Sequence, residues 1–417
     1  MYMSLLFIIL LLLSGESFAE ATFEPPVRIN DDPLQINFHD TYSSGQRSIA
    51  VKGKNVAIVW NDIRNGNNDV FFSFAGDGGK TFSKNIRVND DNKGGNQWYA
   101  EVALDEKGIA YVVWEDDRDG KGNIYFAKKE EKKEGFTKNI PVSPDAKSEQ
   151  GGPAIAVDKK GTIYLAWHDN RNGNNDISLA KSRNGGKNFE KPVRVDDTGN
   201  DVSDQIYPTI AVDDKDNVYA AWYDYRNGNS DIYFTKSNDG GRTFSKSIKV
   251  NFGEDEKEKT GQNSPSIVTD GKGGVYLTWE DKRNPKTGSD VYFTRLTDAG
   301  DSFEKNIHID DEDAENSSQN YPSIAVNEKG IIVIAWDDGR SGFSDIYLSY
   351  SNDGGKSFSK NLGLGISNGK HRTAPSVAVD DEGNIYLIYQ EWEKDKKGND
   401  IYFVKGRIKF PLVSDGF

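Results

Sequence analysis

The chain has 417 residues, no cysteine and a formal net charge of −14 at pH 7. Without cysteine it can form neither disulfides nor thiol-based catalytic or metal sites. Its acidic surface repels nucleic acids and anionic membranes, so we expect neither as a partner.

The first expected element is a signal peptide over residues 1–19. Leu5 to Leu13 form an apolar core, and Ser17-Phe18-Ala19 provides a small-residue cleavage site. The apolar core is too short to span a membrane as a helix. We therefore expect a secreted or periplasmic protein that has no membrane span.

Residues 20–410 repeat one unit seven times. Its aromatic anchors are 53 to 57 residues apart and stand at Trp60, Trp114, Trp167, Trp222, Trp279, Trp336 and Tyr389. Each unit contains four short segments of strand composition, which in the fourth unit cover 208–212, 218–222, 231–235 and 248–251. Units of this size are typical of propeller blades. We predict an all-β fold, a single seven-bladed β-propeller of four-stranded antiparallel blades.

The fourth strand is missing from the last repeat. A matching segment stands at the other end of the chain, where Val27-Arg28-Ile29-Asn30 repeats the pattern of Ile86-Arg87-Val88-Asn89. We predict that this N-terminal strand pairs in the last blade and closes the ring, because closure removes an exposed sheet edge. Residues 411–417 are left as a C-terminal tail.

The loops divide between two faces of the predicted ring. Loops that join the second strand to the third, and one blade to the next, share a top face; the other turns share a bottom face. The top-face loops repeat an Asp-x-Arg motif, and the first strands are preceded by a repeated Gln. The pairs are Asp62/Arg64, Asp116/Arg118, Asp169/Arg171, Asp224/Arg226, Asp281/Arg283 and Asp338/Arg340; the glutamines are Gln97, Gln150, Gln205, Gln262 and Gln319.

Arg can bind the carboxylate of an acidic sugar with two hydrogen bonds. One ligand has no need of six equivalent pairs, so we interpret the Asp-x-Arg motif as a structural tie. The acidic loops at 89–92, 196–197 and 310–315 carry the oxygen ligands that calcium prefers, but not the alternating spacing of a calcium loop. We expect no cofactor and no metal site, with calcium as the one ion left open.

Bottom-face turns carry a second repeated motif. Ser237-Asn238-Asp239-Gly240-Gly241-Arg242-Thr243-Phe244 matches the pattern S-x-D-x-G-x-T-W/F, and the turn beginning at Ser351 matches it too. The chain thus resembles the Asp-box, or BNR-repeat, propellers, whose best-known members are sialidases. The acidic positions of the five turns are Asp77, Asn184, Asp239, Asp298 and Asp353. We interpret them as structural acceptors for turn N–H groups.

The resemblance implies the fold but transfers no catalytic residue. Sialidases of the family use an Arg triad, a Tyr with a Glu partner, an acid/base Asp and a Phe/Tyr-Arg-Ile-Pro motif on six blades. Here seven blades are predicted, and Val27-Arg28-Ile29-Asn30 lacks the flanking aromatic and the Pro of that motif. The catalytic residues are therefore unknown.

Departure from the repeat is our guide to a ligand site. Blade seven departs most, with Tyr389-Gln390-Glu391-Trp392-Glu393 in its top-face loop, and its neighbour blade one has the longest loop before its first strand. An exposed Trp beside charged groups is typical of a sugar site. The candidate ligand-binding residues are His39, Asp40, Tyr42, His371, Arg372, Glu391 and Trp392. His168 is isolated and His308 is expected on the surface, so neither indicates a metal.

The leading hypothesis is a secreted recognition module for a glycan or an extracellular protein. One alternative is a sialidase-like glycoside hydrolase, with Glu391 and Asp40 as its first candidate carboxylates. Another is a structural protein of the cell envelope or of an assembly. The sequence favours the first because it shows no acid/base constellation.

Overall fold

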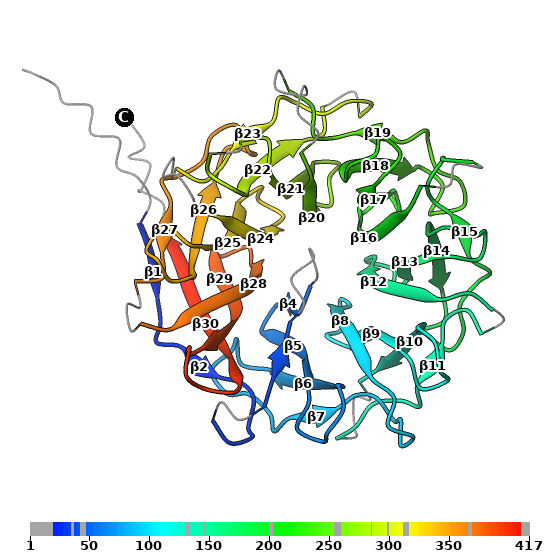
Figure 1. The fold of residues 1–417 in the computed structure, drawn as a ribbon, viewed down its shortest axis with the longest axis horizontal. Coiled ribbons are helices and arrows are strands. Elements are labelled where there is room, and N and C mark those ends of the chain that lie inside the picture. The colour runs from blue at the N-terminus through cyan, green and yellow to red at the C-terminus, as the bar shows by residue number, and fades with distance from the viewer. Residues whose placement is uncertain are drawn as a thin grey trace, which may run out of the picture.

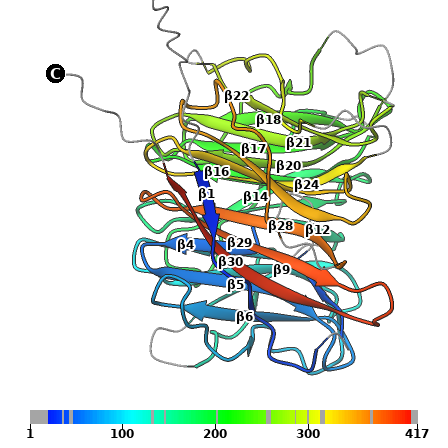
Figure 2. The same cartoon turned by 90° about the vertical axis from the view of Figure 1, so that its left-hand side faces the viewer.

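The computed structural model describes residues 20–34, 37–41, 47–129, 134–144, 147–199, 203–253, 260–284, 286–297, 300–311, 317–365 and 369–409. They form seven blades arranged in a ring around a central channel (Figures 1 and 2). This confirms the predicted seven-bladed, four-stranded antiparallel propeller. Among the described residues, none forms a helix of the length and hydropathy needed to cross a bilayer. The expected signal peptide and C-terminal tail lie outside the described residues.

The strands follow one another from the channel outward in each blade. Blade one contains β3 (His39–Asp40), β4 (Ile49–Lys52), β5 (Asn55–Asp62), β6 (Asp69–Ala75) and β7 (Ile86–Arg87). Blade two contains β8 (Gln97–Leu104), β9 (Ala110–Asp116), β10 (Asn123–Lys128) and β11 (Ile140–Pro141). Blade three contains β12 (Gln150–Val157), β13 (Ile163–Asp169), β14 (Asp176–Ser182) and β15 (Val193–Arg194).

The remaining blades keep the same order. Blade four contains β16 (Gln205–Val212), β17 (Val218–Asp224), β18 (Asp231–Ser237) and β19 (Ile248–Lys249). Blade five contains β20 (Gln262–Thr269), β21 (Val275–Asp281), β22 (Asp290–Arg295) and β23 (Ile307–His308). Blade six contains β24 (Gln319–Val326), β25 (Ile332–Asp338), β26 (Asp345–Ser351) and β27 (Leu362–Gly363).

Blade seven joins the two ends of the chain. Its inner strands are β28 (His371–Val379), β29 (Asn384–Trp392) and β30 (Asn399–Lys409), and its outer edge is formed by β1 (Glu20–Phe23) and β2 (Val27–Arg28). Both N-terminal strands pair antiparallel with β30, Val27 opposite Phe403 and Phe23 opposite Gly406. The predicted closure is confirmed, and β1 lengthens it beyond the predicted strand.

The inner strand of blade one differs from the prediction. We expected a long loop before this strand, with His39, Asp40 and Tyr42 in the loop. Instead His39 and Asp40 form β3, which pairs with the end of β5, while β4 pairs with its beginning. The inner strand of blade one is therefore split into β3 and β4. The extra residues of this blade are inserted between these two strands and not before the first of them.

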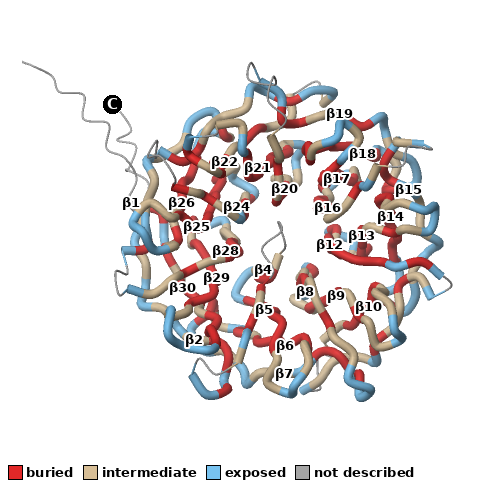
Figure 3. The backbone as a smooth tube through the Cα atoms, viewed as in Figure 1, coloured by how far each residue is buried: buried red, intermediate tan, exposed pale blue. Residues whose placement is uncertain are grey.

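The hydrophobic core lies between neighbouring blades. Each apolar cluster combines side chains of two blades; Val59 of blade one, for example, packs in the same cluster as Val112 and Trp114 of blade two. The six Trp anchors are fully buried, and buried residues follow the middle strands in Figure 3. Each anchor Trp donates its indole N–H to the Asp two positions later, as Trp222 does to Asp224 at 2.9 Å.

The Asp-x-Arg motif ties the blades together. Asp224 is fully buried and accepts hydrogen bonds from Arg226 Nε (2.9 Å) and Nη2 (2.6 Å). The Arg226 guanidinium lies 4.0 Å from the centre of the Tyr233 ring, and its Nη1 reaches Asp197 after the last strand of blade three at 3.2 Å. Equivalent pairs to the preceding blade are Arg64–Asp31, Arg118–Asp90 and Arg340–Asp311.

The bottom-face turns use their acidic residue as an internal acceptor. Asp239 Oδ1 accepts the N–H groups of Arg242 and Thr243 at 2.9 and 3.0 Å. Asp77, Asn184 and Asp353 accept equivalent N–H groups, and Asp298 lies outside the described residues. Gly355 of one such turn has φ +81°, and a Cβ there would lie 2.6 Å from Phe293 of the preceding blade. Position 355 therefore requires glycine for two reasons: the positive φ, and the short distance between the backbone and the Phe293 ring.

Among the described residues, Arg47 of blade one reaches across the channel. Its half-buried side chain donates from Nη2 to the carbonyl oxygen of Ile267 in blade five, at 2.5 Å. Glu101 of blade two accepts the backbone N–H groups of Arg47 and Ile155, and burial raises the pKa of this carboxyl to about 7. Toward the bottom face the channel opens into a cavity of 670 Å³ lined by turns such as Lys52–Lys54 and Asp380–Glu382.

Candidate functional site

A backbone irregularity shapes the top end of each inner strand. Strands β8, β12, β16, β20, β24 and β28 each contain a bulge. At each bulge one residue has a positive φ of 49° to 54°: Tyr99, Gly152, Tyr207, Ser264, Tyr321 and Ala374. Such a conformation is rare for residues other than glycine, and it is kept where surrounding structure holds it.

Seven residues, one in each blade, directly follow the aromatic anchors: Asn61, Glu115, His168, Tyr223, Glu280, Asp337 and Gln390. In blades two to five this residue accepts a backbone N–H group at the bulge of the next blade. Glu115 Oε2 accepts the Gly152 N–H at 3.2 Å, His168 Nδ1 accepts the Tyr207 N–H at 3.4 Å, and Glu280 Oε1 accepts the Tyr321 N–H at 2.7 Å. One role of this position is therefore to satisfy a backbone donor that the bulge leaves without a sheet partner.

Only two of the seven side chains are more than marginally accessible. Glu115 and His168 are half-buried, whereas the other five are buried. The difference arises at Gly151 and Gly152, which replace larger residues of other blades. A Cβ on Gly151 would lie 2.6 Å from Glu115 Oε2 and 2.7 Å from His168 Nε2, so both polar atoms face the space that the missing side chain leaves.

Burial moves the pKa values of this pair in opposite directions. It raises the pKa of Glu115 to about 7, assisted by the charges of Asp117 and Glu149 and opposed by the Gly152 N–H. It lowers the pKa of His168 to about 4 against the charges of Asp204 and Asp169. Because His168 Nδ1 accepts a hydrogen bond, its neutral ring carries the proton on Nε2. Near pH 6, Glu115 is mostly protonated and His168 is neutral.

Aromatic side chains surround the two groups. The Tyr99 and Tyr207 hydroxyls are 3.2 Å apart and their ring centres 5.5 Å apart, and Tyr207 lies against Gly152 of the blade between them. The Tyr207 ring also meets His168 edge-on at 5.2 Å. Trp98 is the cross-strand partner of Glu115. We call Tyr99, Glu115, His168 and Tyr207, with Gly151–Gly152, the top-mouth site.

The structure brings four of the sequence-predicted residues together in blade seven. His371 lies opposite Trp392 and Arg372 opposite Glu391 in the β28–β29 register. Arg372 is only 1% exposed; it pairs with Glu391 at 3.1 Å and with Asp345 of blade six at 3.0 Å. Glu391 is also buried and pairs with Lys370 at 2.7 Å. Arg372 and Glu391 therefore form a blade-to-blade tie like those of the Asp-x-Arg pairs.

Trp392 and His371 form a small aromatic surface beside that tie. Their rings stack with centres 4.0 Å apart, and Phe343 lies 5.3 Å from His371. Phe343 is 45% exposed, so this cluster is accessible. It lacks the charged partners that the sequence had placed beside it, because Arg372 and Glu391 are buried in their own ion pairs.

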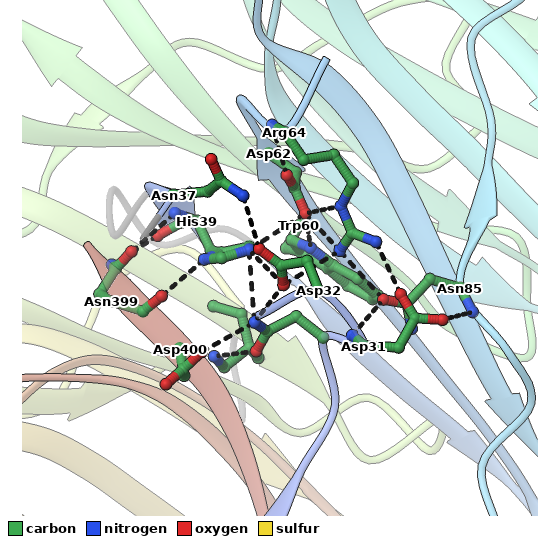
Figure 4. A network of polar contacts seen from close by, with 12 residues as sticks. Asp31, Asp32, Asn37, His39, Trp60, Asp62, Arg64, Asn85, Asn399 and Asp400 are labelled. Carbon is green, nitrogen blue, oxygen red and sulfur yellow. Dashed lines mark hydrogen bonds and ion pairs between the residues drawn. The ribbon is translucent and has the colours of Figure 1, made fainter. Parts of the chain in front are cut away.

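The residues predicted in blade one are part of a buried polar network (Figure 4). His39 is 1% exposed; its Nδ1 donates to the Asn399 carbonyl oxygen at 2.6 Å, and its Nε2 lies 3.1 Å from Asp32 and 3.2 Å from Asp62. Asp40 accepts a hydrogen bond from Gln390 at 2.8 Å. Tyr42 lies outside the described residues.

Asp32, His39 and Asp62 are close enough to hold a metal ion. Their polar atoms, however, already form hydrogen bonds and ion pairs with neighbouring side chains. Asp32 Oδ1 accepts from Asn30 at 2.7 Å, and Asp62 Oδ2 accepts from Trp60 at 3.1 Å and pairs with Arg64 at 2.6 Å. Burial alone would lower the pKa of His39, but the bonds and charges of Asp32 and Asp62 raise it to about 9. A protonated His39 fills the place that a cation would take.

Comparisons with known proteins identify the fold. No family model and no curated protein matches the chain. A solved ulvan lyase, a polysaccharide lyase bound to a -[GlcA(1-4)Rha3S]- unit, aligns over 90% of this chain and 94% of its own, with a TM-score of 0.59 and 13% identity. A protein of unknown function from Dyadobacter fermentans aligns over 78% and 98%, with a TM-score of 0.55 and 12% identity. The endosialidase of phage phi92 aligns over 94% and 70%, with a TM-score of 0.52 and 12% identity. At such identities the similarity shows the propeller fold alone.

Sequence reasoning missed Glu115 and considered His168 only as an isolated histidine. A signal was present: the residue between the anchor and its Asp differs from blade to blade while its neighbours repeat. Six different residue types occupy that position in seven repeats. Its variability indicates that the fold tolerates several polar side chains there.

Proposed function

We propose that the protein is a glycan-recognition module that binds a neutral polysaccharide at the top-mouth site. The observation that carries the proposal is the half-buried, uncharged pair Glu115 and His168 beside the Tyr99–Tyr207 aromatic pair, with Tyr207 in contact with His168. Sugar rings are bound by aromatic stacking together with a few placed polar groups. A neutral carboxyl and a neutral imidazole can donate hydrogen bonds to hydroxyl groups without the cost of burying a charge.

The charge around the site supports a neutral ligand. Asp117 and Glu149 act on Glu115, and Asp169 and Asp204 act on His168. Together with the net charge of −14, these carboxylates would repel an anionic polymer. Secretion, expected from residues 1–19, would bring the protein into contact with extracellular polysaccharides.

Replacing Tyr207 should weaken this binding. Tyr207→Ala removes a stacking surface, and blade seven already carries Ala374 at the same bulge position with φ 54°, so the backbone accommodates alanine. We expect roughly 5- to 30-fold weaker binding of the best neutral glycan, from the loss of about 1–2 kcal/mol of aromatic contact. The measurement is a glycan array followed by calorimetric titration of the best ligand.

Trp392→Ala is the control, because it removes the aromatic residue that the sequence had favoured. It should leave binding near the wild-type value. The proposal fails if Trp392→Ala abolishes binding while Tyr207→Ala does not, which would place the site on blade seven. Preference for anionic over neutral polymers would contradict the assigned ligand class.

Cleavage of the bound glycan is a second candidate function. It is favoured by the opposed pKa shifts, since a protonated carboxyl and a neutral imidazole can act as general acid and general base. Turnover would need Glu115 protonated and His168 neutral, so it should be highest between about pH 4 and pH 7.

Glu115→Gln keeps the shape of the side chain and removes its titrating proton. If the protein is a hydrolase, we expect turnover to fall by about 10²- to 10⁴-fold, measured as release of reducing ends. Glu280→Gln is the matched control, because Glu280 occupies the same position in blade five but is buried. Equal turnover in Glu115→Gln and wild type would refute the acid role, and a glycan that is bound but never cleaved would leave recognition as the function.

A further inference from the structure

A second acidic cluster departs from its counterparts in the other blades. It consists of Asp290 at the start of β22, His308 in β23 and Asp310 just after it. One ligand atom from each of the three residues lies within 4.8 Å of the others. Asp290 and Asp310 are 0% and 4% exposed. Two carboxylates and an imidazole thus meet in the interior of blade five.

The equivalent residue in blade four, Asp231, has a cation and side-chain amides as partners. Asp231 pairs with Lys249 Nζ at 3.1 Å and accepts hydrogen bonds from Asn251 at 3.0 Å and from Asn227 at 2.8 Å. Blade one repeats the arrangement, with Arg87 at 2.6 Å and Asn89 at 2.8 Å from Asp69. A cation and side-chain amides therefore neutralise this buried carboxylate.

Blade five has replaced each of these donors. His308 stands where blade four has Lys249, and Asp310 stands where it has Asn251. The preceding loop is two residues longer, with nine positions from Asp281 to Asp290 against seven from Asp224 to Asp231. The Thr287 hydroxyl donates to the Asn284 carbonyl oxygen at 3.4 Å; it also lowers the pKa of Asp290, but less than burial raises it.

Asp290 consequently lacks the ammonium and amide donors that its counterpart in blade four has. Among the described residues, neither of its two carboxylate oxygens has a hydrogen-bond partner, and neither does Asp310 Oδ1. Asp310 Oδ2 accepts the Val291 N–H at 2.8 Å and lies 2.9 Å from His308 Nε2. Buried carboxylate oxygens without a donor are costly and indicate a missing positive partner.

We propose that Asp290, His308 and Asp310 bind a divalent zinc-like cation that takes the place of the lysine or arginine of blades one, three, four and seven. Imidazole selects zinc and its first-row neighbours, whereas calcium and magnesium prefer oxygen ligands alone. Three protein ligands and one open position are a common zinc arrangement, in which ligand atoms at about 2.0–2.2 Å from the ion lie within about 4 Å of each other. Small rotations of the three side chains would reach that spacing. The His308 side chain is 32% exposed and gives the ion a route of entry.

The test is zinc binding to protein first dialysed against a chelator. We expect calorimetry with ZnCl₂ to give one site per chain, and saturating zinc to raise the melting temperature by about 2–5 °C, because a ligand that binds only the folded state stabilises it. CaCl₂ and MgCl₂ at the same concentration should produce no comparable shift.

The decisive variant copies blade four into blade five. His308→Lys combined with Asp310→Asn restores the ammonium and the amide, so it should fold, as circular dichroism would show, and lose the zinc site. If that variant misfolds, Asp310→Asn alone should bind zinc at least 10-fold more weakly. His39→Gln and His371→Ala should both keep the site, since they alter histidines elsewhere. Unchanged stoichiometry in both blade-five variants, or no zinc binding by the wild type, would overturn the proposal.

Discussion

Deleting residues 20–31 should lower the melting temperature by more than 10 °C or prevent folding. The deletion removes β1 and β2, which together cover the outer edge of β30. It also removes Arg28 and Asn30, whose side chains neutralise the buried Asp400 at 2.8 and 2.9 Å. An uncompensated buried carboxylate alone costs about 3–5 kcal/mol, before the loss of strand pairing is counted. Thermal unfolding followed by circular dichroism measures the effect.

A shorter deletion separates the two contributions. Removing residues 20–25 takes away β1 but leaves β2, Arg28 and Asn30, so we expect a smaller loss of stability. Residues 20–31 would be dispensable for closure if the longer deletion melted at the wild-type temperature. Equal losses in the two deletions would assign the effect to β1 and not to the ion pair.

Stability should fall as the pH rises from 7 to 9, through deprotonation of His39. The pKa of His39 is about 9 in the folded protein, against 6.5 for the free side chain. A raised pKa means that the folded state holds the proton more tightly, so this stabilisation is complete below pH 6.5 and is lost as the pH passes through 9. The difference corresponds to up to about 3 kcal/mol for this buried group. Urea unfolding at several pH values would show the decline.

Glu101, Glu115 and His168 affect stability mainly below pH 7. Burial raises the pKa of Glu101 and Glu115 to about 7, so their effect on stability changes mainly below pH 7. His168, with a pKa of about 4, acts below pH 6.5. His39→Gln should therefore flatten the profile between pH 7 and 9 at the cost of stability at pH 6. A slope that persists in the variant would show that another group is responsible.

The sequence predicted the scaffold because the scaffold is repeated. Seven anchors at nearly constant spacing determined the blade count, and Val27–Asn30 matched the strand that the last blade lacked. Two features of the scaffold were not predicted: the split inner strand of blade one and the additional strand β1. Each occurs once in the chain, so the repeat offers no counterpart for comparison.

The candidate sites were harder to predict because they depend on neighbours in space. Arg372 and Glu391 depart from the repeat in sequence but restore the usual ion pair in three dimensions. Glu115, conversely, occupies a repeat position, and it is accessible only because Gly151 of the next blade has no side chain. His308 appeared to be an ordinary surface residue, and the contrast with Lys249 became visible only once the structure placed each beside its buried carboxylate.

Because the N-terminal strands close the ring, the ring can be completed only after the C-terminal strand β30 has been synthesised. Arg28 pairs with Tyr402, so the first strands of the propeller emerge from the ribosome some 370 residues before their partner. At about 5–20 residues per second, that gap lasts roughly 20 to 75 s. Throughout this interval the nascent chain carries two strands without a sheet, and pairing with another copy competes with waiting for β30. The last blade is thus the step at which a newly made molecule either completes its own ring or exchanges a strand with its neighbour.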